Sequence, residues 1–108
     1  MSQEAPTVDL LLFEVGGTVM GADASQVLRI DAVAPDKKRA AGARALVFQA
    51  EDGERFVAVD EVREVKTVNV TDLRRMPEAT GAPPYAIGVW LDGARPVPLV
   101  DLVEFSKS

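Results

Sequence analysis

The 108-residue chain contains neither cysteine nor histidine. Without cysteine there is no disulfide framework, no thiolate nucleophile and no cysteine metal site, and this fits a reducing compartment. Without histidine the chain lacks the commonest metal ligand and the commonest general base near neutral pH. These absences exclude most enzyme chemistries. We therefore expect a protein that is not an enzyme, with no catalytic residue, no metal site and no cofactor.

Three further features are also missing. The formal charge is −5, so the chain lacks the basic excess that binding to a phosphate backbone requires, and nucleic acid is an unexpected partner. The longest apolar cluster, residues 10–13, is far too short to span a bilayer, so direct membrane insertion is not expected. The first residues lack the basic start and apolar core of a secretory signal. These features predict a cytoplasmic protein.

Few groups suggest chemistry. The densest acidic group is Asp60, Glu61 and Glu64, but strand alternation places Glu61 on the opposite face from the other two, so we expect a solvated surface. A serine triad is excluded because it needs histidine. A lysine-assisted serine hydrolase and a small-ligand-binding β-barrel stay open as alternatives, although the sequence shows no set of converging polar groups.

The chain contains an internal repeat with a period of 35 residues. Leu11-Leu12-Phe13 corresponds to Leu46-Val47-Phe48, Val27 to Val62, and Ile30 to Val65. Each copy also contains a turn signal between runs that are typical of strands: Gly16-Gly17 in the first and Asp52-Gly53 in the second. A repeated supersecondary unit implies one architecture used twice, so the repeat predicts a duplicated small β-barrel.

Short β-prone runs separated by glycine turns make the predicted class all-β, within a single domain at 8–105 that follows a disordered tail at 1–7. The expected strands are 8–15, 18–22, 27–33, 45–50, 55–59, 61–68, 85–91 and 96–105. A helical turn capped by Asp23 is expected at 23–26, and one short helix at 69–76. Pro96 and Pro98 favour a strand at a sheet edge or the entry of a strand, and Trp90 favours the core.

Residues 34–44 join the two copies and are rich in small, proline and basic residues, with four of the twelve basic residues of the chain. This composition is typical of a solvated surface linker. The alternative is a docking patch for an acidic partner.

The order of these motifs resembles the CheW-like coupling proteins of bacterial chemosensory pathways. In that family an apolar strand ends in a Phe and is followed by a glycine turn and a short turn that leads to a valine. The segments that carry the resemblance are 11–17, 23–30, 46–48, 56–65, 85–93 and 96–102, and together they cover most of residues 9–105.

The resemblance implies two intertwined, five-stranded SH3-like barrels that bridge chemoreceptor tips to a CheA-type histidine kinase. Family members carry an Asn-Leu-Arg-Gly-like turn and a Pro-x-x-Asp-Leu strand between the two copies, whereas this chain has only the short linker at 34–44. The first barrel is therefore expected to be truncated, as in short couplers of the FrzB type from motility signalling. We expect an adaptor that binds the receptor's cytoplasmic domain, with kinase coupling reduced or lost.

The resemblance assigns partner contact to Val27, Leu28 and Ile30, and more weakly to Val57, Val59 and Val62. The alternative is that these six residues fill the barrel interiors. A second functional hypothesis is a competitive modulator of a longer, full-length CheW-like paralogue. Because a truncated barrel leaves unpaired strand edges, a homodimer is a further expectation.

Overall fold

A computed structural model describes residues 6–33, 42–75 and 83–107. Nine strands, two short 3-10 helices and one α-helix are present in these ranges. In chain order they are β1 (Thr7–Val15), β2 (Thr18–Asp23), η1 (Ala24–Gln26), β3 (Val27–Ala32), β4 (Arg44–Ala50), β5 (Gly53–Val59), β6 (Glu61–Asn69), η2 (Val70–Asp72), β7 (Leu73–Arg75), β8 (Ala86–Asp92), β9 (Arg95–Val100) and α1 (Leu102–Ser106). The all-β class is thus confirmed.

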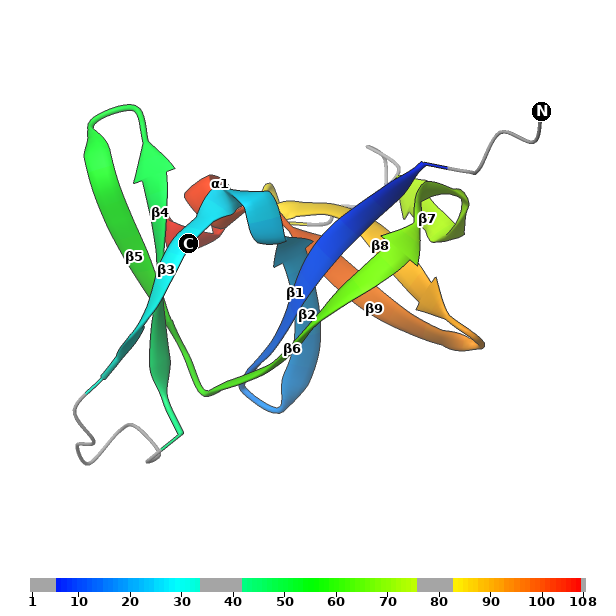
Figure 1. Ribbon diagram of the computed structural model, residues 1–108, viewed down its shortest axis with the longest axis horizontal. Coiled ribbons are helices and arrows are strands. Elements are labelled where there is room, and N and C mark those ends of the chain that lie inside the picture. Colours follow the sequence, from blue (N-terminus) through cyan, green and yellow to red (C-terminus); the bar gives the residue numbers. More distant parts are fainter. Residues whose placement is uncertain (1–5, 34–41, 76–82, 108) are drawn as a thin grey trace.

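The strands form two sheets (Figure 1). One has six strands in the order β6-β1-β2-β9-β8-β7, and the other has three in the order β3-β4-β5. The truncated half expected from the sequence corresponds to the three-stranded sheet. The described strands therefore build two unequal open sheets rather than a pair of closed barrels.

The two repeat copies exchange their third strands. Strand β1 pairs with its hairpin partner β2 and with β6 from the second copy. In the same way β4 pairs with its hairpin partner β5 and with β3 from the first copy. Residues 35 positions apart thus occupy matching places in the two sheets, and we call them repeat equivalents. The exchange links the two halves into one unit.

Strand β1 is apolar on both faces because it borders two cores. Leu11 and Phe13 point between the sheets into a central core, whose buried members are Leu11, Phe13, Ala22, Leu46, Phe48, Val59, Val100 and Leu102. Leu10 and Leu12 point the other way into an end core enclosed by the six-stranded sheet, with Val68, Trp90, Val97 and Leu99. The buried position predicted for Trp90 is confirmed.

The tight hairpin between β1 and β2 follows from its glycines. Gly16 and Gly17 have φ values of 58° and 82°, and a two-residue turn that matches the strand twist requires such positive values. After β2, the Asp23 carboxylate accepts hydrogen bonds from the backbone N–H and the hydroxyl of Ser25, which caps η1 as predicted.

The predicted strand at 96–105 is wrong beyond residue 100, because β9 ends at Val100 and α1 follows. Asp101 caps this helix by accepting a hydrogen bond from the N–H of Val103. The helix covers the central core, where Phe105 packs edge-on against Tyr85 at a centroid distance of 4.9 Å. A local cap and ring packing therefore override the strand propensity of the C-terminal residues.

Two other predictions are also wrong. In place of a helix at 69–76 there are η2 and β7, because Leu73 to Arg75 pair with β8 instead. The proline-containing strand β9 is not at an edge, since it lies between β8 and β2. Its pairing with β2 is a single parallel bridge between Gly21 and Leu99, so little ladder hydrogen bonding is lost to the prolines.

The ends and the linker are only partly described. Strand β1 begins at Thr7, and the Pro6 carbonyl accepts a hydrogen bond from the Val70 N–H, so the ordered part begins before residue 8. Residues 1–5 of the predicted tail and 34–41 of the predicted linker lie outside the described residues. None of the helices in the described ranges is both long and apolar enough to cross a membrane.

Candidate binding groove

A shallow apolar groove lies between the two exchanged strands β3 and β6. It has a volume of about 300 Å³ and is lined by Leu11, Ala24, Val27, Arg29, Ile30 and Val65. Five of these six side chains are apolar. Buried Leu11 belongs to the central core, and the register places it opposite Val65. We call this site the binding groove.

The groove exists because β3 and β6 lie at the outer edges of their sheets. Both strands carry a register shift at the same place in the repeat. In β3 it lies between Val27 and Arg29. In β6 it lies between Val62 and Glu64, which are opposite the neighbouring residues Phe13 and Leu12 of β1. Such shifts are typical of β-bulges, which re-aim side chains and often lie beside functional sites. The shift lets Val27 and Ile30 share one face despite their odd spacing.

The exposed apolar side chains beside the groove have no structural need to be apolar. Ile30 is 44 % exposed and Val65 is 58 % exposed, although both lie on strands with one core face. Leu28, in the β3 bulge, is 52 % exposed. Its repeat equivalent is Arg63, which forms an ion pair with Glu14 at 2.6 Å. An apolar residue at the corresponding exposed place on β3 favours a partner-binding role for Leu28.

Charge is confined to one rim of the groove. The Arg29 guanidinium donates to Glu54 at 2.8 Å and to Asp31 at 3.2 Å. The hydrogen bond to Glu54, followed by that to Asp31, raises the pKa of Arg29 above its ordinary value. Arg29 is therefore held on the side of the three-stranded sheet, and the groove itself stays apolar.

The structure brings together part of the predicted contact set. Val27 and Ile30 line the groove, and Leu28 is exposed beside it. Val57 and Val62 are half-buried and pack on the central core, while Val59 is only 2 % exposed. Val59 thus offers almost no surface to a partner, and its place is structural. The partner contacts expected for the other five residues stay predictions.

Val65 was missing from the predicted contacts. The signal for it was present in the repeat, because Val65 is the repeat equivalent of Ile30. The exchange of strands brings these two equivalents to the same groove, a relationship that the sequence pattern could not reveal without the pairing of β1 with β6.

The acidic group noted in the sequence has a structural member. The Asp60 carboxylate accepts a hydrogen bond from the Gly16 N–H at 2.8 Å, and the Asp60 N–H donates to the Glu14 carbonyl at 2.9 Å. These bonds join the crossing between β5 and β6 to the β1–β2 hairpin. Asp60 therefore fixes the passage of the chain from one sheet to the other.

Comparisons with known proteins agree with this architecture. No family model matches the chain. The chain is 46 % identical over 108 residues to the Frizzy aggregation protein FrzB of Myxococcus xanthus, covering 94 % of this chain and 96 % of that protein. Its fold is similar to the crystal structure of the scaffolding protein TtCheW from Thermoanaerobacter tengcongensis, with a TM-score of 0.75, 11 % identity and 90 % of each chain covered.

The two sheets with exchanged strands and the likeness to a solved scaffolding protein define a CheW-like fold. The fold alone would leave the family open at 11 % identity. The full-length match resolves it: the chain belongs to the family of the Frizzy aggregation protein FrzB. The chain thus shares its family with FrzB and its fold with a CheW scaffolding protein, as the resemblance in its sequence implied.

Proposed function

We propose that the chain is a cytoplasmic adaptor that binds the helical cytoplasmic tip of a chemoreceptor through the binding groove. The observation that carries the proposal is the pair of exposed repeat equivalents, Ile30 and Val65, which face one apolar groove from two different sheets. Exposed apolar residues gathered in one concave place are typical of an interaction surface.

The shape and chemistry of the groove suit a helix. Amphipathic helices commonly dock by laying apolar residues into a groove with apolar walls. Here one wall is formed by Val27 and Ile30 on β3 and the other by Val65 on β6, above Leu11. Complete burial of a branched aliphatic side chain contributes roughly 1.5–3 kcal/mol. Ile30 and Val65 are already about half-buried, so the groove supports a weak to moderate affinity. That range fits a reversible component of a signalling array.

Kinase coupling is the part of the bridging role that we propose to be reduced or lost. The resemblance implies that the segment between the repeat copies supplies receptor and kinase surfaces. In this chain the same segment is the short stretch between β3 and β4, and the first half has three strands among the described residues. A full-length CheW-like paralogue would then supply the kinase contact that this chain gives up.

The test is a side-by-side affinity measurement against a receptor cytoplasmic hairpin and a CheA-type regulatory domain. We expect the receptor hairpin to bind, and Ile30→Glu and Val65→Glu each to weaken binding about tenfold or more, because a charge in the groove must be desolvated. Val27→Glu tests the predicted contact that is half-buried in the groove, in the same assay. The kinase domain should bind much more weakly than the receptor.

A matched control is Ile87→Glu on β8, where the native side chain is 53 % exposed and lies outside the groove. This variant should keep the affinity of the native chain. Circular dichroism of every variant would separate lost binding from lost folding. Equal receptor affinity for the native chain and the two groove variants would contradict the proposal.

A further inference from the structure

In the described residues no strand covers one face of the three-stranded sheet, although Ala45 and Val47 at its centre are only 8 % and 5 % exposed. By the repeat, Ala45 and Val47 on β4 are the equivalents of Leu10 and Leu12, which fill the end core of the other half. In the three-stranded sheet this face, which we call the open face, is bordered by Arg29, Asp31, Ala32, Val33, Glu54, Arg55 and Phe56. The open face is thus the interior that a complete barrel would enclose.

The two halves also differ beside the matching strands β2 and β5. In the six-stranded sheet β2 is followed by β9, whose Leu99 bridges to Gly21. A Cβ atom at Gly21 would lie only 3.0 Å from Leu99 Cδ2, so a side chain there would have to displace Leu99. The repeat equivalent of Gly21 is Phe56 on β5, which is 61 % exposed and lies on an edge strand. The place that β9 takes beside β2 is free beside β5 in the described part of the chain.

From this difference we propose that β5 is a dimerisation edge, on which the β5 strand of a second copy adds in the antiparallel direction. The pairing extends the sheet to the order β3-β4-β5-β5-β4-β3 and gives the truncated half six strands, as in the other sheet. Unpaired edge strands present free N–H and C=O groups that readily accept another strand. This inference does not depend on the proposed function, because β5 lies at the opposite edge of the sheet from β3.

The sequence of β5 selects both the occupant and the register. Directly opposite residues of antiparallel strands point to the same face of the sheet, and faces alternate along each strand. Two identical β5 strands related by a two-fold axis perpendicular to the sheet meet this condition only if the axis passes beside one residue, which is then opposite its own copy. With Phe56 on the axis, all seven residues from Gly53 to Val59 overlap. Glu54 then faces Ala58 of the second copy, and Arg55 faces Val57. Within Gly53–Val59 no like charges meet, and the two exposed Phe56 rings lie side by side.

The neighbouring registers are less favourable. An axis at Arg55 places two arginines directly opposite each other, and an axis at Val57 leaves only the five residues from Arg55 to Val59 in overlap. Like charges directly opposite on paired strands destabilise the pair. The strand is therefore self-complementary in the register that also gives full overlap.

The first experiment is sedimentation velocity of the full chain over a concentration series, without receptor. We expect a reversible monomer–dimer equilibrium for the native chain. Phe56→Asp places two carboxylates on the axis and should raise the dimer dissociation constant about tenfold or more. Ile87→Asp, at a similarly exposed apolar residue on the other sheet, should leave it unchanged. A chain that stays monomeric at high concentration, or a dimer that survives Phe56→Asp, would overturn the proposal.

A second experiment reports the register. Since the chain has no cysteine, Phe56→Cys introduces a single thiol. Directly opposite residues in antiparallel strands have Cα atoms about 4.5–5.5 Å apart, within the range for a disulfide. Mild oxidation should therefore link Phe56→Cys rapidly into covalent dimers, and Ile87→Cys slowly. Equal rates for the two variants would count against pairing through β5. Neither experiment involves the receptor, so failure here leaves the binding groove untouched.

Discussion

The two halves of the repeat share one central core but differ in what covers their other face. In the six-stranded half, β9, β8 and β7 close over an end core that contains Leu12 and Trp90. In the three-stranded half, the equivalent face carries Val47 among charged neighbours and has no covering strands in the described ranges. Both halves thus keep the strands that build the shared central core. Only the six-stranded half has further strands that build an end core.

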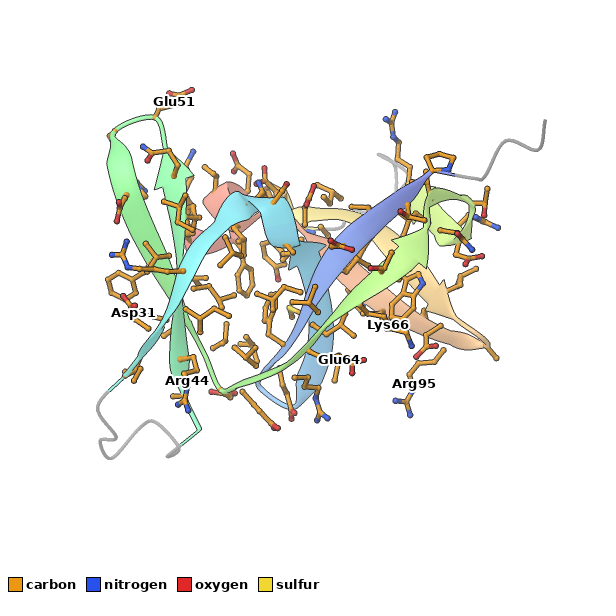
Figure 2. The ribbon with its side chains drawn as sticks, viewed as in Figure 1. Asp31, Arg44, Glu51, Glu64, Lys66 and Arg95 are labelled. Atoms are coloured by element: carbon orange, nitrogen blue, oxygen red, sulfur yellow. The ribbon has the colours of Figure 1, made fainter. Side chains whose placement is uncertain are left out.

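The charges on the open face show how the reduced half adapts to water. Arg29 forms ion pairs with Glu54 and Asp31 across the three strands, where the six-stranded half uses apolar packing. The repeat equivalents Asp31 and Lys66 lie in different halves of the molecule (Figure 2). The Lys66 ammonium nitrogen lies 5.3 Å from the centroid of the Trp90 ring. Asp31 therefore lies on the open face, whereas its repeat equivalent Lys66 lies at the rim of the end core.

The largest expected effect tests the part that the halves share. Phe13→Ala and Phe48→Ala remove repeat equivalents that are both fully buried in the central core. Each should lower the free energy of unfolding by about 3–5 kcal/mol, a large share of the stability of a domain this size. Chemical denaturation followed by tryptophan fluorescence measures both losses. Losses that differ severalfold between the two variants would mean that the core is not shared equally.

The next effect sharpens the contrast between the halves. Gly21→Phe introduces the side chain of its repeat equivalent into the contact with Leu99, and should cost about 3 kcal/mol or more through overpacking. Phe56→Ala, the opposite change on the exposed edge of β5, should alter stability by less than about 0.5 kcal/mol in the monomer. The same denaturation series at low protein concentration compares them. Similar costs for the two changes would refute the assignment of β5 as an open edge.

The fold was largely predictable from the sequence, and the prediction failed where contacts distant in sequence decide. The hairpin at Gly16-Gly17 and the cap at Asp23 follow from local rules, and the 35-residue period revealed the duplication. The strand predicted at 96–105 gives way to a helix at Leu102–Ser106, which depends on the Asp101 cap and on packing against the central core. Strand exchange is a long-range pairing that no local pattern encodes, so Val65 was not recognised as part of the binding groove.

A smaller effect concerns the ion pair on the open face. A double-mutant cycle with Arg29→Gln and Glu54→Gln should give a weak favourable coupling that shrinks as salt is added, because exposed ion pairs are screened by salt. Denaturation at low and high ionic strength measures it. If the coupling were unaffected by salt, the open face would not be exposed to water as described.

The smallest effect is a local response to pH. Arg55 hydrogen-bonds the Asp52 carboxylate at the end of the β4–β5 hairpin and lowers the pKa of Asp52 below its ordinary value of 3.8. The associated stability is therefore present above that value and is lost as pH falls through the lower folded pKa. Carboxyl NMR titration should show the Asp52 pKa rising towards its ordinary value in Arg55→Gln. An unchanged Asp52 pKa in that variant would show that the ion pair does not form in solution.

The most direct test of the central claim is a methyl NMR titration of the chain with a receptor cytoplasmic hairpin. We predict that the methyl signals of Val27, Leu28, Ile30 and Val65 shift together on binding, while those of Ile87 and Leu91 on β8 stay in place. Shifts confined to β8, or no shift in the binding groove at saturating receptor, would contradict the account.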